Sequence, residues 1–136
     1  QGIMWRAVLE AIGYDYIYVA DMYRNAGCNL DRIVVTEGGS KSSLWNQIKA
    51  DMLGSEVVTL ENIEGAVLSD AILAAYAVGD IHDLKKALLD VVKVKKVYTP
   101  NKENTKFYRE MFKIQQQIIR NDMKSVFNQL EKMRSL

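Results

Sequence analysis

Residues 32–60, RIVVTEGGSKSSLWNQIKADMLGSEVVTL, carry the strongest structural signals in the chain. The β-branched run near their start predicts a strand over 32–36, which we expect to be buried on both faces. Two glycines break this strand, and Ser42 and Ser43 can both cap the helix that follows. Apolar residues recur at helical spacing along that helix, which should stop at Gly54.

Outside this segment, helical patterns dominate. Apolar residues at intervals of three and four predict helices over 3–26 and 64–78, each followed by a glycine that favours a left-handed cap. A second strand is expected at 57–58. A further short helix should reach about Val92, with Asp80 as its cap.

The last third of the chain has a different composition. Residues 93–104 are polar, contain the only proline, and are expected to form a linker or surface loop. Over 105–134, apolar residues recur every three or four positions, which predicts one long amphipathic helix whose apolar stripe needs a partner surface. We therefore divide the chain, 1–136, into an α/β core over 1–92, this linker, and a C-terminal helix over 105–136.

The order strand, helix, strand, helix predicts a parallel β-α-β unit, so the expected fold class is helix-rich α/β. Parallel sheets usually contain more strands than two and are covered on both faces. A two-stranded sheet leaves open edges that invite pairing with another strand. We therefore expect the chain to be part of a larger domain, and an open edge also allows a homodimer.

Composition limits the classes of protein to consider. The 136 residues are 49% hydrophobic and 26% charged, as in ordinary folded domains, and the single cysteine suits a reducing compartment. The longest charge-free apolar stretch, 71–79, has nine residues, whereas roughly 20 are needed to cross a bilayer. Arg6, Glu10 and Asp15 interrupt any signal peptide. These features predict a cytoplasmic protein that contacts no membrane.

Charge is distributed unevenly along the chain. Residues 1–84 hold five Lys/Arg against twelve Asp/Glu, a net charge of −7, whereas 85–136 hold thirteen against five, a net charge of +8. The basic half can fold against the acidic half, bind an anionic partner, or form a solvated helix face. Because no aromatic or Arg-rich pattern accompanies the lysines, we expect no nucleic-acid binding.

The strand-to-helix turn after Val35 is the best candidate for a ligand site. In open parallel sheets, ligands bind beyond the carboxyl ends of the strands, where a helix N-terminus presents unpaired N–H groups. Gly38 and Gly39 would let a phosphate or a nucleobase lie against the backbone. Residues 38–43, GGSKSS, match neither a Walker A motif nor GxGxxG, so the spacing alone also allows a plain turn.

Four blocks of the chain resemble the FGGY family of carbohydrate kinases. Residues 36–54, TEGGSKSSLWNQIKADMLG, closely resemble the adenosine-motif segment of that family. Residues 6–12 look like the helix that precedes it, and residues 64–71, EGAVLSDA, look like a later helix. Residues 98–104, YTPNKEN, with Tyr108, are similar to a stretch near the end of xylulokinase-like members. The blocks occur in register and cover nearly the whole chain.

The resemblance implies a two-domain enzyme of the actin-like, ribonuclease-H-like ATPase type, with ATP in the cleft between the domains. It implies transfer of the γ-phosphoryl of ATP, with magnesium, to a sugar hydroxyl. The chain resembles the last part of the second domain, so the implied partners are ATP, a sugar and a missing N-terminal domain. The sugar-binding residues and the catalytic aspartate of the family precede the matched part. We therefore expect the chain alone to be inactive, since phosphoryl transfer depends on positioning and electrostatics.

The resemblance also places nucleotide-contacting positions on this sequence. Gly39 and Ser43 match positions whose family counterparts contact the nucleotide, and Gly38, Ser40 and Lys41 line the same loop. It assigns no residue to catalysis or to a metal.

Two departures from the family pattern affect the same region. Glu37 stands where the family usually has glycine, and Ser69 and Asp70 replace a small Gly-Ala pair on the helix near the cleft. A carboxylate at either place would weaken triphosphate binding unless magnesium or a base offsets its charge.

Other residues have simpler structural explanations. Trp45 is expected in the core, and Asn46 and Gln47 could tie the loop to its own helix. Cys28 is expected to be a buried structural thiol. The acidic and histidine residues over 80–83 fit a helix cap better than a metal site.

The sequence thus predicts a partial sugar kinase, xylulokinase-like, that supplies the adenosine-binding side of an ATP cleft. The alternative is a helical protein-interaction module whose basic C-terminal helix binds an acidic partner. Binding of ATP distinguishes the two hypotheses.

Overall fold

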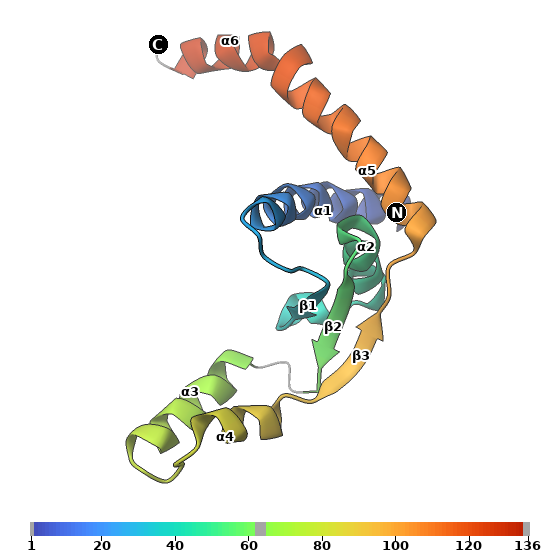
Figure 1. Cartoon of the computed structure of the whole chain (residues 1–136). Coiled ribbons are helices and arrows are strands. Elements are labelled where there is room, and N and C mark those ends of the chain that lie inside the picture. Colours follow the sequence, from blue (N-terminus) through green and yellow to red (C-terminus); the bar gives the residue numbers. More distant parts are fainter. Residues whose placement is uncertain (1, 62–64, 135–136) are drawn as a thin grey trace.

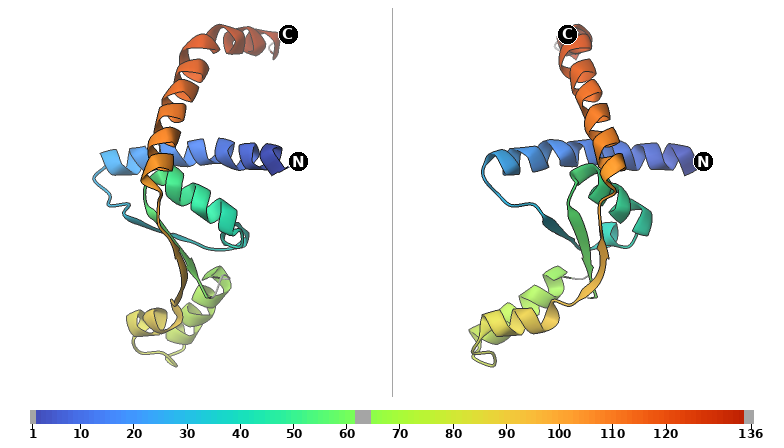
Figure 2. Two further views of the ribbon diagram at one scale, coloured as in Figure 1. Left: turned by 90° about the vertical axis from the view of Figure 1, so that its right-hand side faces the viewer. Right: turned by 45° about the vertical axis from the view of Figure 1, so that its right-hand side comes forward.

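The computed structural model describes residues 2–61 and 65–134 (Figure 1). Its elements in chain order are α1 (Gly2–Asn25), β1 (Arg32–Val35), the 3-10 turn η1 (Gly38–Ser40), α2 (Ser43–Leu53), β2 (Glu56–Leu60), α3 (Gly65–Ala77), α4 (Leu84–Val91), β3 (Val94–Tyr98), α5 (Lys102–Gln117), the π-helical turn η2 (Ile118–Asp122) and α6 (Lys124–Arg134). Helix α2 lies between α1 and the sheet, the α3–α4 pair lies at one end, and α5 leads away at the other (Figures 1 and 2).

The strands form one mixed sheet in the order β1-β2-β3. β1 and β2 pair in parallel, which confirms the predicted β-α-β unit. β3 adds to the other edge of β2 in the antiparallel direction, with Val57 opposite Tyr98. The register between them shifts at Thr59 and Leu60, so the ladder contains a β-bulge.

Two sequence-based expectations about the sheet are wrong. The predicted linker over 93–104 contains β3 and the start of α5, because Val94–Tyr98 pairs with a strand more than thirty residues away in the sequence. The predicted burial of β1 on both faces is also wrong, since its residues alternate between exposed and half-buried. β1 is an edge strand within the described part of the chain, and only its β2 side is paired.

Helix α2 is the centre of the packing. On one side Met52 joins a cluster with residues of α1 and α5, including Ile17 and Tyr108. On the other side Ala50 packs on Val57 and Tyr98 of the sheet. The helix therefore connects these two hydrophobic clusters.

Helices α1 and α2 approach closely at one glycine. A Cβ at Gly13 would overlap the Sδ atom of Met52, whose side chain is fully buried. The crossing therefore depends on the absence of a side chain at this position.

Helix α4 begins later than the sequence predicts. Its N-cap is Asp83, whose carboxylate accepts a hydrogen bond from the backbone N–H of Lys86 at 2.9 Å, so the cap predicted at Asp80 is wrong. The preceding helix, α3, is followed by Gly79 with φ +86°. The residues between Gly79 and Leu84 form the turn that leads into α4. α3 and α4 then pack against one another as a hairpin (Figure 2).

The predicted C-terminal helix is present, but it starts earlier and is interrupted. It begins at Lys102, because the Asn101 side chain caps the N–H groups of Glu103 and Asn104 at 2.9 and 3.1 Å. The turn η2 separates α5 from α6, and the chain bends there (Figure 1). Large apolar side chains along this arm are exposed: Phe107, Ile114, Phe127, Leu130 and Met133.

Within residues 2–61 and 65–134, no helix combines the length and the apolar content needed to span a bilayer.

Candidate functional site

The turn that follows β1 is a tight, internally bonded loop. The backbone N–H of Ser40 donates to the carbonyl of Glu37 at 3.0 Å, and that of Lys41 donates to the carbonyl of Gly38 at 3.3 Å. The Ser40 hydroxyl also donates to the Glu37 carbonyl at 2.7 Å. Glu37 adopts φ 58° and ψ −157°, a conformation that glycine adopts far more readily. A glycine at position 37 would adopt this backbone conformation with less strain than glutamate does.

Helix α2 holds this loop from behind. The Asn46 side-chain amide donates to the Ser40 carbonyl at 2.7 Å, which confirms the predicted tie. Lys49, also buried, donates from Nζ to the Gly39 carbonyl at 3.3 Å. The predicted tie through Gln47 is wrong, because its side-chain amide donates instead to Asp51 at 2.8 Å and to the Thr99 carbonyl at 2.9 Å. The loop is thus fixed to a buried helix.

The two glycines of the loop face open space. Neither Gly38 nor Gly39 has a positive φ, and a Cβ built on either would meet no atom within 4 Å. Glycine is therefore required here neither by backbone conformation nor by packing inside the described chain. The peptide planes are accessible to a flat ring or a phosphate group, so the loop fits the nucleotide that the resemblance implies.

Two pockets flank the loop. One, of about 470 Å³, lies toward α3 and α4 and is lined by Glu37 and Ser69 among mostly apolar residues. The other, of about 240 Å³, lies toward β3. Its lining residues are Ser40, Lys41, Ser43, Thr59, Leu60, Lys95, Lys96 and Tyr98.

The five predicted site residues therefore divide into two groups. The structure brings Ser40, Lys41 and Ser43 together in the smaller pocket, whereas Gly38 and Gly39 line neither pocket. The departures from the family pattern divide as well, because Glu37 and Ser69 meet at the larger pocket and Asp70 does not line it.

Two side chains near the loop, Lys49 and Tyr98, have lowered pKa values. Burial lowers the pKa of the Lys49 ammonium from 10.5 to about 8. The Ser43 hydroxyl can donate a hydrogen bond to the Tyr98 phenolate, which lowers the pKa of Tyr98 against the opposing effect of burial, and Asn46 and the Lys96 ammonium lower it further. The Tyr98 hydroxyl donates to Ser43 Oγ at 3.2 Å, and the Lys96 ammonium lies 4.6 Å from the Tyr98 ring centre.

The buried amide of Asn46 has one polar atom without a partner. Its Nδ2 donates to the loop, but its Oδ1 accepts no hydrogen bond from the described residues, although the side chain is fully buried. A buried acceptor without a partner is costly, and the hydrogen bond that Nδ2 donates to the Ser40 carbonyl offsets part of this cost.

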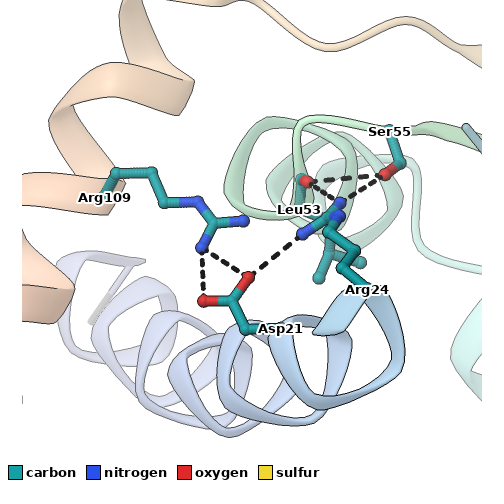
Figure 3. Close-up of polar contacts among 5 residues, drawn as sticks. All are labelled: Asp21, Arg24, Leu53, Ser55 and Arg109. Carbon is teal, nitrogen blue, oxygen red and sulfur yellow. Dashed lines mark hydrogen bonds and ion pairs between the residues drawn. The ribbon is translucent and has the colours of Figure 1, made fainter. Parts of the chain in front are cut away.

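Two aspartates that could be considered as catalytic bases hold the structure together instead. Asp21 accepts hydrogen bonds from Arg109 Nη1 at 2.8 and 2.7 Å and from Arg24 Nη1 at 3.3 Å, which joins α1 to α5 (Figure 3). Arg24 also donates to the Leu53 carbonyl at 2.6 Å and to Ser55 Oγ at 3.0 Å, at the end of α2.

Asp51 has a similar structural role at the junction of β3 and α5. Its carboxylate accepts from the backbone N–H of Asn101 and from the side-chain amide of Asn104, each at 2.8 Å. In the part of the chain that the structure describes, no three His, Cys, Asp or Glu side chains gather closely enough to hold a metal ion.

Sequence reasoning missed the part of the smaller pocket that β3 contributes. Lys95, Lys96 and Tyr98 all lie within the predicted linker, whose polar residues and single proline indicated a loop. The signal that could have found the strand is the valine and tyrosine content of 94–98, since β-branched and aromatic residues favour strands.

Comparisons with known proteins agree on one family. The family model described as "FGGY family of carbohydrate kinases, C-terminal domain" matches residues 1–78. A xylulose kinase of Staphylococcus epidermidis is 33% identical over 113 residues, which cover 83% of this chain and 23% of that protein. A xylulose kinase of Haemophilus influenzae is 35% identical over 109 residues, 79% of this chain and 22% of that protein.

Solved structures give the same result. The ligand-bound xylulose kinase from Lactobacillus acidophilus superimposes with a TM-score of 0.77 at 26% identity, over 93% of this chain and 26% of that one. The gluconate kinase from the same species matches with a TM-score of 0.77 at 26% identity, over 93% of this chain and 25% of that one. These likenesses confirm the predicted fold class. The chain spans about a quarter of the length of the relatives it matches.

Proposed function

Because the chain belongs to the FGGY family of carbohydrate kinases, we propose that it supplies the adenosine-binding side of an ATP cleft in a xylulokinase-like enzyme. The whole enzyme would transfer the γ-phosphoryl group of ATP to a hydroxyl of a sugar. Magnesium would accompany the triphosphate and offset its charge.

The observation that carries this proposal is the open face of the turn after β1. Gly38 and Gly39 present bare peptide planes, and Asn46 and Lys49 hold the carbonyls of the same turn from the buried side. A binding surface that is already fixed loses little conformational freedom when a ligand binds. The arrangement therefore suits a nucleoside that must be placed accurately.

Each loop residue has a part in this proposal. The backbone of Gly38 and Gly39 contacts the adenosine, Ser40 shapes the turn, and Lys41 and Ser43 add a charge and a hydroxyl at its end. The catalytic base and the sugar-binding residues belong to the N-terminal part of the family fold. The chain by itself is therefore expected to transfer no phosphoryl group.

Binding of ATP by the isolated chain tests the proposal. In saturation-transfer NMR, the adenine protons of ATP should receive magnetisation from the chain. Gly39→Val should reduce this transfer about tenfold, because a branched side chain would cover the peptide plane. Gly2→Val is the matched control, since a Cβ at Gly2 also meets no atom within 4 Å and its φ is not positive.

The control should bind as the unchanged chain does. Transfer to the adenine protons that survives Gly39→Val at full strength would contradict the proposed contact. A colorimetric assay of ATP consumption in the presence of xylulose should show no turnover by the chain, and turnover would contradict the assignment of the catalytic base to another part of the fold.

The interaction-module hypothesis is favoured by a different observation. The arm formed by α5, η2 and α6 exposes a row of large apolar side chains and carries basic residues, including Lys132 and Arg134 in its last turn. An interaction module would show no adenine contacts in the same NMR experiment.

A further inference from the structure

The β-bulge places two consecutive lysines at one pocket. Successive side chains of a regular strand point to opposite faces of the sheet. Lys96 pairs with Thr59, whereas Leu60 pairs with Val94, so Lys95 is the extra residue of the bulge. Bulges redirect side chains in this way, and both Lys95 and Lys96 line the pocket of about 240 Å³.

A third lysine reaches the same pocket from the loop. Lys41 follows η1 and lines the pocket beside Lys95 and Lys96. No aspartate or glutamate lines it, and none of these three lysines forms an ion pair with a described residue. Three like charges around one small space repel one another unless an anion lies between them.

Hydroxyl groups complete the lining of the pocket. Ser43 Oγ accepts a hydrogen bond from the Tyr98 hydroxyl, and its own proton is donated to no other group of the described chain. Ser43 is also the first residue of α2, where the helix dipole favours negative charge. A donor, a helix N-terminus and three ammonium groups thus converge on one space.

We propose that this pocket binds the phosphate group of a small anion, at a site that adjoins the open face of Gly38 and Gly39 but does not include it. Its volume of about 240 Å³ lies below the range of about 300–1,000 Å³ that is typical for larger organic ligands. Free phosphate and a sugar monophosphate share the required chemistry. The pocket shares Ser40, Lys41 and Ser43 with the proposed nucleotide-binding loop, but Gly38 and Gly39 line no part of it. Variants of Lys95 and Lys96 therefore test the anion site, and variants of Gly39 test the adenosine contact.

Titration with inorganic phosphate, followed by amide chemical shifts of the whole chain, tests this site. Phosphate at constant ionic strength should shift the amides of Ser43, Lys96 and Tyr98. The double variant Lys95→Gln/Lys96→Gln should weaken this binding about tenfold, because two of three positive charges are removed. Lys95→Arg/Lys96→Arg should retain the binding. A parallel titration with glucose 6-phosphate shows whether a sugar monophosphate occupies the same site more tightly than free phosphate.

The matched control is Lys85→Gln/Lys86→Gln, which removes the same charge from an adjacent lysine pair in α4 that does not line the pocket. It should bind phosphate as the unchanged chain does. Equal loss in the control, shifts that persist in the Lys95/Lys96 variant, or no shift at these amides with either anion would overturn the proposal. ATP contacts that depend on Gly39 should survive Lys95→Gln/Lys96→Gln, so failure of the anion site and failure of the proposed function are separate results.

Discussion

Helices α2 and α6 have the same length, 11 residues, and opposite environments. Eight residues of α2 are buried, whereas α6 has none. Both helices carry apolar residues at helical spacing, so the difference comes from their neighbours. α2 has α1 and α5 on one side and the sheet on the other, while α6 follows the bend at η2 and lies apart from the body (Figure 1). An amphipathic pattern predicts a helix, but burial depends on what packs against it.

The comparison also explains why the candidate site has a fixed shape. The turn after β1 is bonded to Asn46 and Lys49, two buried residues of α2. A loop attached to an exposed helix such as α6 would lack this support. The three predictions that follow test the packing of α2, its buried lysine and the turn that it supports, from the largest expected effect to the smallest.

The largest effect is expected from shortening a core side chain of α2. Met52→Ala should lower the free energy of unfolding by about 2–5 kcal/mol, because it leaves a cavity where Met52 is 0% exposed. Met133→Ala in α6, where the residue is 70% exposed, should change it by less than about 0.5 kcal/mol. Urea denaturation of both variants measures the contrast. Equal losses would mean that α6 is packed as tightly as α2.

A smaller effect should appear in the pH dependence of stability. Burial lowers the pKa of Lys49 to about 8 from its ordinary 10.5, so between these values the unfolded chain binds more protons than the folded chain. Stability should therefore rise with pH across this window, by up to about 1.4 kcal/mol per pH unit. Lys49→Met should remove the rise, and Lys124→Met in α6 should retain it.

Urea denaturation at pH 7.5, 8.5 and 9.5 measures this difference. A parallel rise in Lys49→Met would assign the pH dependence to another group.

The smallest effect concerns the turn that α2 supports. Glu37→Gly should raise the free energy of unfolding by about 1 kcal/mol, because it relieves the left-handed backbone at φ 58°. Glu61→Gly is the control, since Glu61 has no positive φ, and it should be neutral or destabilising by up to about 1 kcal/mol. Thermal unfolding compares the two variants, and stabilisation by both would point to loss of charge rather than relief of strain.

The sequence predicts where the helices lie, and it predicts the ends of α1 and α2 well, because these ends depend on local signals. Ser42 caps α2, and Gly54 ends it with φ 64°. Gly27 follows α1 with φ +86°, as its left-handed cap requires. Side-chain oxygen atoms and glycines act on neighbours within a few residues, so a linear pattern contains the relevant information.

Features that depend on distant contacts could not be predicted in the same way. β3 exists because it pairs with β2, and the composition of 94–98 does not identify that partner. Residues of β3 line the smaller pocket, so the sequence could not predict this pocket without predicting the strand. Cys28 is exposed, so its predicted burial is wrong, because no described element packs over the turn that follows α1.

The contact of Gly13 with Met52 has a consequence for the evolution of this fold. Since any Cβ at position 13 overlaps the thioether of Met52, the two positions share one volume. Among homologues, a larger residue at the first position should coincide with a shorter one at the second, and the pair should covary more strongly than either does with its sequence neighbours.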